Sequence, residues 1–188
     1  MKFKHFVITR FNLPIFPTRN NGEKVKNCDV DFLNKRLDIF EKYCMPSLKN
    51  QTNQDFIWFV MFDANTPDVI KGRLSHIENG MNNMSICYFD LQKYTVLSKE
   101  YINLYNEYAL KVPYNLDTVS DDNYEINSEL IQRCSTPKFI GDLIRNYLNE
   151  EGCDYIITTR IDNDDAFHKD MIDSVQRQTN MLFAKRGG

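Results

Sequence analysis

The sequence predicts an α/β fold in which a mostly parallel central sheet is flanked by helices. Strand-like and helix-like patterns alternate along the 188 residues, and the strand-like segments are runs of apolar residues rather than strict alternations of apolar and polar ones. Apolar runs are typical of parallel strands that are buried on both faces. Because no repeat, Gly/Ser linker or low-complexity tract divides the chain, we expect one domain over residues 1–188.

Near the N-terminus the pattern predicts a strand, an irregular segment and a helix. The segment 3–11 contains an apolar run and is followed by Pro14, which predicts a strand that ends in a loop. Residues 14–30 lack periodicity, so we expect irregular structure there. After Asp31, apolar residues recur at helical spacing with charged residues between them. This pattern predicts an amphipathic helix that is interrupted or restarts around Pro46.

Two further strands follow, with a helix between them. Residues 56–62 are all apolar and stop at Asp63, which predicts a second buried strand. Residues 67–77 predict a helix, and residues 85–89 predict a third strand. The order up to this point is therefore βαβαβ, as expected of a doubly wound α/β domain.

The C-terminal half contains one segment without a clear pattern and then a helix and a strand. We interpret residues 91–132 as an insertion or a mobile loop. Thr136 and Pro137 predict the start of an amphipathic helix that ends before Gly152. The apolar, β-branched run 155–161 then predicts a buried, central strand.

Composition excludes several classes of partner. A net charge of −3 gives no reason to expect nucleic acid or an anionic membrane, and no apolar stretch approaches the length of a membrane span. The N-terminus leads into a strand rather than a signal-peptide core, so we expect a cytoplasmic protein. The cysteines are odd in number, scattered and without a CxxC pair, so we expect reduced and mostly packed thiols at Cys28, Cys44, Cys87, Cys134 and Cys153.

A cluster of acidic residues follows the last predicted strand directly. Asp162, Asn163, Asp164 and Asp165 come after residues 155–161. Ligands of open α/β sheets collect at the carboxyl ends of strands. Carboxylates placed there can share a hard divalent cation, which takes oxygen ligands and can also hold a diphosphate. The sequence therefore predicts a metal site at this strand end.

Helix capping is the alternative interpretation of the same residues. Aspartate is a preferred N-cap and favours the positive end of a helix, so Asp164 or Asp165 could cap a helix that begins near Ala166. Both interpretations can hold at once, with one carboxylate capping the helix while its neighbours bind metal.

Several segments together resemble a glycosyltransferase of GT-A type, and specifically the bacterial putative rhamnosyltransferase family. The similarity extends across most of the chain. It is carried by His5-Phe6-Val7-Ile8-Thr9-Arg10-Phe11-Asn12, Cys44-Met45-Pro46-Ser47-Leu48, Gln51-Thr52, the strand from Phe56 to Asp63, and Thr159-Arg160-Ile161-Asp162-Asn163-Asp164-Asp165-Ala166.

The resemblance implies a GT-A (Rossmann-like) nucleotide-sugar-binding domain and a metal-dependent glycosyltransferase. The enzyme would move a sugar, rhamnose by the family name, from a nucleotide-sugar donor to a glycan or lipid-linked glycan acceptor in polysaccharide biosynthesis. The resemblance also implies that four residues contact the donor: Thr9, Arg10, Asp63 and Asp162. Asp164 would bind the divalent metal, Mn²⁺ or Mg²⁺, on the diphosphate, and Asp165 could replace it as the ligand.

Three other side chains have two interpretations each. Arg10 and Arg160 are either phosphate partners or counter-charges to the neighbouring carboxylates. His168 either joins the metal or is a solvated residue in the first turn of a helix. Trp58 lies among apolar neighbours, which predicts a core residue rather than a platform for stacking a sugar.

The acceptor-facing part of a GT-A enzyme normally follows the acidic motif, but only 23 residues follow Asp165. Asp170 and Asp173 are candidates for the catalytic base by residue type alone, and we assign that role to neither. Residues 181–183 are apolar, as if a further strand began there, so we expect a chain that is truncated at its C-terminus. A non-catalytic module that binds nucleotide sugars or a partner protein is the alternative function.

Overall fold

The computed structural model describes residues 2–13, 18–20, 23–25, 28–90, 93, 123–148 and 152–186. The chain divides into two compact units. Unit 1 comprises Met1–Leu13, Lys26–Tyr88 and Glu151–Gly188, and unit 2 comprises Pro14–Val25 and Phe89–Glu150. The expectation of a single domain stays a prediction.

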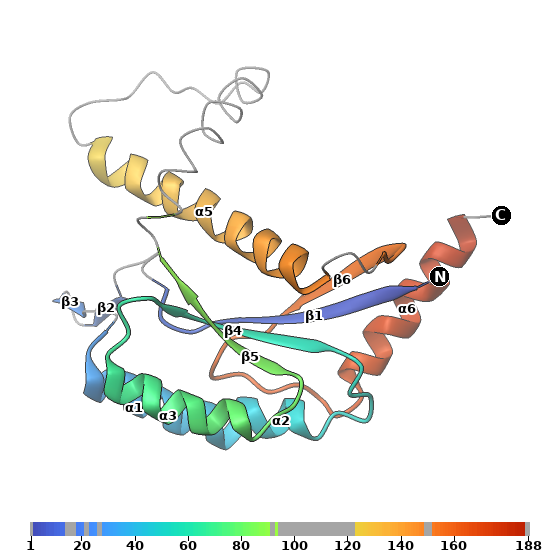
Figure 1. Cartoon of the computed structure of the whole chain (residues 1–188), viewed down its shortest axis with the longest axis horizontal. Coiled ribbons are helices and arrows are strands. Elements are labelled where there is room, and N and C mark those ends of the chain that lie inside the picture. Colours follow the sequence, from blue (N-terminus) through green and yellow to red (C-terminus); the bar gives the residue numbers. More distant parts are fainter. Residues whose placement is uncertain are drawn as a thin grey trace. The chain divides into compact units, whose positions relative to one another are not determined.

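A four-stranded sheet forms the centre of unit 1 (Figure 1). The strands lie in the order β5-β4-β1-β6, and β1 pairs in parallel with both β4 and β6. This arrangement confirms the predicted α/β fold with a mostly parallel sheet. The bounds of the strands are Phe3–Arg10 for β1, Ile57–Asp63 for β4, Met84–Phe89 for β5 and Tyr155–Arg160 for β6.

The two inner strands are the most buried. Every residue of β4 is buried, and so are Phe6 and Val7 of β1, as expected of strands covered on both faces. The prediction that residues 155–161 form a central strand is wrong, because β6 lies at one end of the described sheet. Its burial alternates, with Ile156 exposed and Ile157 buried. β-Branched residues favour a strand wherever it lies in a sheet, so composition alone did not locate β6.

The predicted first helix consists of three consecutive helical segments. Helix α1 (Val30–Ile39) begins after Asp29, whose side chain accepts a hydrogen bond from the backbone of Phe32 at 2.8 Å. A π-helical turn, η1 (Phe40–Cys44), follows and leads into α2 (Met45–Lys49). Pro46 lies in the first turn of α2, where its missing N–H is tolerated.

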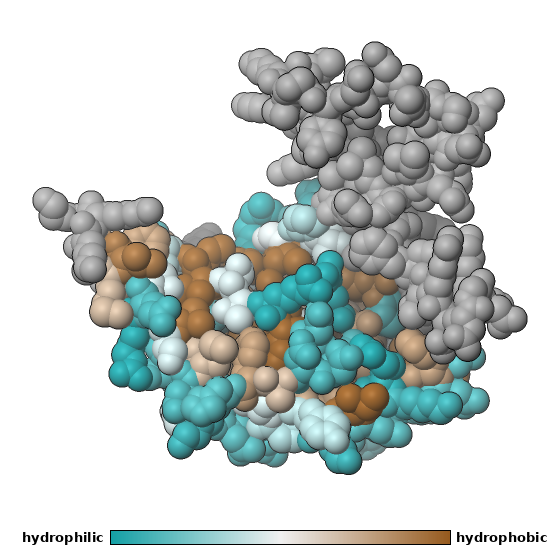
Figure 2. Space-filling view, turned by 180° about the vertical axis from the view of Figure 1, so that it is seen from behind, coloured by the Kyte–Doolittle hydropathy of each residue, from teal (hydrophilic) through white to brown (hydrophobic). Residues whose placement is uncertain are grey.

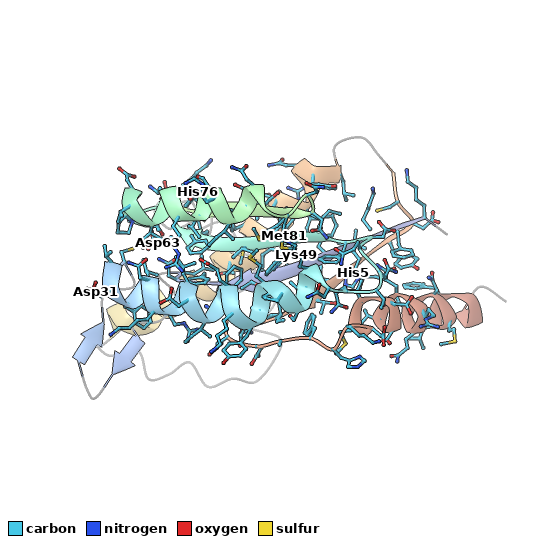
Figure 3. All side chains as sticks on the ribbon, turned by 90° about the horizontal axis from the view of Figure 1, so that it is seen from below. His5, Asp31, Lys49, Asp63, His76 and Met81 are labelled. Atoms are coloured by element: carbon cyan, nitrogen blue, oxygen red, sulfur yellow. The ribbon has the colours of Figure 1, made fainter. Side chains whose placement is uncertain are left out.

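Helix α3 (Asp68–Asn79) lies beside α1 on the same side of the sheet (Figures 1 and 3). The Arg73 guanidinium joins the two helices by donating to Asp38 at 2.7 Å and to Glu41 at 2.9 Å. Apolar residues from these helices and the inner strands form the core beneath them, including Leu33, Leu37, Phe40, Trp58, Phe62, Ile70 and Leu74. The predicted core position of Trp58 is confirmed, because its side chain is fully buried.

Helix α6 (Met171–Arg186) packs near the amino ends of β1 and β6. Gln176 donates to the backbone oxygen of Asp55 at 2.8 Å and lies 3.3 Å from His5 Nδ1. Tyr155 of β6 bonds to Asn180 and stacks on Phe183. The expected strand at residues 181–183 is therefore wrong, since the apolar residues there belong to a helix.

Unit 2 contains three elements that the sequence did not predict correctly, two strands and one helix. Strands β2 (Thr18–Asn20) and β3 (Glu23–Val25) pair antiparallel within the segment expected to be irregular. Helix α5 (Asn123–Leu148) begins well before the predicted start and contains Pro137 in its interior. An internal proline removes one backbone donor, but the rest of the helix can continue around it. Most of the segment 91–132 interpreted as an insertion or loop lies outside the described residues.

Cys28, Cys44, Cys87 and Cys153 are free thiols, as predicted for these four positions. The side chain of Cys134 lies outside the described part. The surface mixes hydrophilic and hydrophobic residues (Figure 2), and its exposed large apolar side chains include Met181 and Leu182 of α6. Within the described ranges, no helix combines the length and apolar character needed to cross a bilayer.

The buried His5 makes stability depend on pH. Its Nε2 lies 2.8 Å from the Thr159 hydroxyl, and burial lowers the pKa of His5 from 6.5 to about 4, although Asp55 raises it. The unfolded chain therefore takes up the proton first. We expect the free energy of unfolding to fall as the pH drops from about 6.5 to about 4, by up to about 3 kcal/mol.

Urea unfolding across that pH range measures the effect. His5→Gln should flatten the profile, whereas His76→Gln, at an exposed position on α3, should leave it unchanged. An unaltered acid-side slope in His5→Gln would contradict the assignment.

Candidate functional site

The carboxyl ends of β1, β4 and β6 meet at one edge of the sheet, because β1 runs parallel to both neighbours. Figure 3 shows Asp63, at the end of β4, far from His5, which lies toward the opposite end of the sheet. Ligand sites of open α/β sheets form at this carboxyl edge. The acidic cluster predicted from the sequence follows β6 and therefore lies there.

Residues 162–165, which we call the acidic turn, are anchored by Asn163. Asn163 is buried, and its Nδ2 donates to the backbone oxygens of Arg10 at 3.5 Å and Phe11 at 3.3 Å. Its Oδ1 accepts a hydrogen bond from Arg36 of α1. One amide thus ties the acidic turn both to the end of β1 and to a helix.

The three carboxylates of the acidic turn have different environments. Asp162 Oδ1 accepts from Arg160 at 2.8 and 3.1 Å, and Asp164 Oδ2 accepts from Arg36 at 3.3 Å. Asp165 is exposed, and no other side chain in the described part bonds to its carboxylate. The capping alternative for Asp164 and Asp165 is wrong, because α6 begins only at Met171.

The charges of the acidic turn act on a buried thiol nearby. Burial and, to a smaller extent, the negative charges of Asp165, Asp164 and Asp162 together raise the pKa of Cys44 to about 12. Cys44 is the last residue of η1 and is fully buried.

Positive charge offsets this acidic cluster. Arg160 acts as a counter-charge to Asp162, which is one of the two roles considered for it. Burial lowers the pKa of Arg10, and the nearby charge of Arg160 lowers it further, whereas Asp162 raises it. No carboxylate among the described residues pairs directly with Arg10, whose guanidinium is partly exposed. Arg10 can therefore offer a charged hydrogen-bond donor to an anion.

The segment after the acidic turn is held by α2 and the loop that follows it. Ser47 Oγ accepts from the backbone of Phe167 at 3.1 Å. The buried amide of Gln51 donates to the backbone oxygen of His168 at 2.8 Å and accepts from Ile172 at 3.1 Å. The His168 side chain is exposed, and its Nδ1 lies 3.7 Å from an Asp170 carboxylate oxygen. His168 is thus solvated, as one alternative held, but it precedes α6 rather than lying in the first turn of a helix.

The end of β4 is also fixed by side chains. Asp63 is buried, and its Oδ1 accepts from the backbone and side-chain nitrogens of Asn65 at 2.8 and 3.0 Å. Asn12 accepts from the backbone of Asp63 at 3.0 Å and donates to Thr66 at 3.2 Å. The Asp63 carboxylate thus bonds within its own turn. Its predicted contact with the nucleotide-sugar donor stays a prediction.

Thr9 has a packing role in this structure. It is fully buried, and its hydroxyl accepts a hydrogen bond from Trp58 Nε1 at 3.0 Å. Its assignment as a donor-binding residue stays a prediction that this packing does not favour. The structure thus brings Arg10, Asp162, Asp164 and Asp165 to the same end of the sheet, whereas the Thr9 side chain is buried against Trp58.

The ligand oxygens that the acidic turn offers decide which kind of cation fits. No group of three or more His, Cys, Asp or Glu side chains in the described ranges is arranged to hold a metal ion. Asp164 and Asp165 offer exposed carboxylates at one turn. Mg²⁺ commonly takes one or two carboxylates, with water and substrate phosphates completing its shell. These residues therefore fit a cation whose other ligands come from a diphosphate and water. The described residues do not form a cage that would hold a cation by protein ligands alone.

Sequence reasoning did not identify Asn163 and Arg36 as site residues. Asn163 lies inside the acidic run, and a polar, non-acidic residue between carboxylates was a signal for a structural anchor. Arg36 lies 127 positions from Asn163 along the chain, so no local pattern could connect them.

Asn163→Asp tests the anchor. A carboxylate has no N–H to donate to the backbone oxygens of Arg10 and Phe11, so these partly buried acceptors would lose the hydrogen bonds from Asn163. We expect the free energy of unfolding to fall by about 1–3 kcal/mol in urea titrations. Asp165→Asn, an exposed change in the same turn, should alter it by less than about 0.5 kcal/mol. Equal stability of the two variants would refute the anchoring role.

The family model described as "Putative rhamnosyl transferase" matches residues 4–137. This range contains β1, α1 with Arg36, and β4, and it ends before the acidic turn. No curated protein and no solved structure matches the chain. The parallel sheet with flanking helices agrees with a Rossmann-like glycosyltransferase domain. Because the match spans more than half of the chain, the chain belongs to the putative rhamnosyl transferase family.

Proposed function

We propose that this chain binds a nucleotide-sugar donor at the carboxyl edge of its sheet and acts as a metal-dependent glycosyltransferase. Membership of a rhamnosyl transferase family supports transfer of a sugar, with rhamnose as the first sugar to test. One observation carries the location of the site. The carboxylates of Asp164 and Asp165 are exposed in the acidic turn, and Arg36 bonds to Asp164. Arg160 bonds to Asp162, and the charges of both act on Arg10.

This mixture of charges suits a diphosphate better than either sign alone. Carboxylates by themselves would repel the donor, and the departing nucleoside diphosphate becomes more negative as the glycosidic bond breaks. A divalent cation bound with the donor would offset that charge. Asp164, with Asp165 as the alternative, would hold the cation, while the partly exposed guanidinium of Arg10 would donate to a phosphate oxygen.

Asp162 is suited to a neutral part of the donor. Its Oδ1 accepts two hydrogen bonds from Arg160, so one oxygen is already engaged and its charge is balanced. The remaining oxygen can accept from a hydroxyl group, as the ribose or the sugar of the donor would require. We propose a glycan or a lipid-linked glycan as the acceptor.

A donor-binding module without turnover is the second candidate, and one observation favours it. Both candidates for the catalytic base are engaged elsewhere. Asp170 accepts from the Thr52 hydroxyl at 3.0 Å, and Asp173 pairs with Arg177 one turn further along α6. We therefore assign the base to neither residue.

Binding of nucleoside diphosphates with and without Mn²⁺ tests the site. We expect Mn²⁺ to tighten binding at least about tenfold, as for one added charged contact, and Asp164→Asn to abolish that gain. Isothermal titration calorimetry measures both constants. Asp38→Asn, an exposed carboxylate on α1 that pairs with Arg73, should behave as wild type. Metal-dependent binding that survives in Asp164→Asn would remove Asp164 from the site.

Turnover separates the enzyme from the binding module. The chain is incubated with a panel of nucleotide sugars and Mn²⁺, and released nucleoside diphosphate is quantified by chromatography. We expect release with at least one donor, and we expect the rate to fall at least about a hundredfold in Asp164→Asn because a charged group at the leaving phosphate is lost. Tight donor binding without any release, including in the presence of acceptor glycans, would favour the module.

A further inference from the structure

We propose that Arg36 is a positioning residue that holds the acidic turn by one permanent and one exchangeable contact. The permanent contact is to Asn163, and the exchangeable one is to Asp164, which Arg36 releases when a divalent cation binds. This inference rests on the proposed function, because it assumes that Asp164 is where the cation binds. It adds a residue from a different segment of the chain to the site.

The hydrogen bond from Arg36 to Asn163 persists in this proposal when a ligand binds. One guanidinium nitrogen of Arg36 donates to Asn163 Oδ1, and the Asn163 side chain is buried against the end of β1. Breaking this bond would leave a buried amide oxygen without its donor, which is costly. Arg36 therefore stays bound to the acidic turn whether or not ligand is present.

The ion pair between Arg36 and Asp164 can be exchanged for a contact between Asp164 and a cation. The other terminal nitrogen of Arg36 lies 3.3 Å from Asp164 Oδ2, and the side chains are 31% and 47% exposed. Ion pairs at such exposed positions contribute little to stability, because water competes for both partners. A cation can take the Asp164 oxygen without disturbing the buried bond to Asn163. The planar guanidinium makes this possible, since it presents separate donors to separate acceptors.

Helix α1 keeps Arg36 in place. Leu33 and Leu37 on the same helix are fully buried in the core, so the backbone that carries Arg36 is fixed. Arg73 offers an internal comparison, because it is similarly exposed and its guanidinium also bonds to residues of this helical region, Asn34, Asp38 and Glu41. All those acceptors lie outside the acidic turn. Removing Arg73 therefore removes an arginine of the same kind without touching the candidate site.

The two roles of Arg36 predict that its removal strengthens Mn²⁺ binding but lowers the free energy of unfolding. As a counter-charge, Arg36 competes with a cation for Asp164, so removing its positive charge should strengthen Mn²⁺ binding. As an anchor, Arg36 supports the turn, so its removal should lower stability. A residue that was only structural would weaken metal binding along with stability, and an inert surface pair would change neither.

The experiment measures free Mn²⁺ by electron paramagnetic resonance during titration of the whole chain, with and without a nucleoside diphosphate. We expect Arg36→Met to bind Mn²⁺ roughly three- to tenfold more tightly than wild type, the range that the loss of one exposed ion pair implies. Arg36→Lys keeps the charge but cannot reach both acceptors in one geometry, so it should gain less. Arg73→Met should match wild type. Asp164→Asn added to Arg36→Met should remove the gain.

Urea unfolding establishes that each variant is folded, and Arg36→Gln replaces Arg36→Met if the latter is not. Unchanged or weaker Mn²⁺ affinity in the folded variant would overturn the inference. If wild type shows Mn²⁺-dependent binding of the nucleoside diphosphate that Asp164→Asn abolishes, the proposed function stands even when Arg36 variants gain nothing. If neither wild type nor the Arg36 variants bind Mn²⁺ with the nucleoside diphosphate, the proposed function and the inference both fail.

Discussion

The parallel pairing of β1 with β6 is the constraint on which the candidate site depends. The pairing continues past the end of β6, where the backbone of Ile161 donates to Ile8 at 3.1 Å. The next residues leave the sheet as the acidic turn, directly beside the end of β1. Only this register allows the Asn163 side chain to reach the backbone oxygens of Arg10 and Phe11. A shift by one residue would turn Asn163 to the opposite face and separate the two strand ends.

Opposite charges are interleaved at this edge rather than segregated. Each of two carboxylates has its own guanidinium: Asp162 has Arg160 and Asp164 has Arg36. Arg10 and Asp165 have no such direct ion pair among the described residues. The charges of the described residues at this edge are therefore close to balanced.

The sequence predicted the framework of unit 1 because burial imposes clear patterns there. The apolar run 56–62 could only be a buried strand, and the spacing of Leu33 and Leu37 indicated a helix. The position of the acidic turn at a strand end was also predictable. The position of β6 at one end of the described sheet was not predictable, because strand pairing depends on partners distant in sequence. The start of α5 was misplaced because Pro137 was taken as a boundary, although a long helix can tolerate an internal proline.

Within the site, short patterns along the chain were readable and long-range contacts were not. The cation expected at the carboxylates after β6 stays a prediction, and so do the donor-binding roles that the family resemblance gave to Arg10 and Asp162. The resemblance also suggested Thr9, whose hydroxyl is occupied by Trp58 in the core. Asn163 and Arg36 became visible only when helix α1 and the end of β6 were seen side by side. Contacts of this kind depend on tertiary packing, which a single sequence does not display.

The π-helical turn η1 has a consequence for how this region tolerates insertions and deletions. A π-turn holds one residue more than an α-helical turn, so it rotates everything after it by about 100° relative to an uninterrupted helix. Ser47 and Gln51 follow η1, and they hold the backbone of Phe167 and His168 just beyond the acidic turn. Loss of a single residue from η1 would swing both side chains away from that backbone while leaving the composition of the helix almost unaltered. The rotation of helix α2 about its axis thus helps to shape the candidate site, although α2 contains no ligand residue.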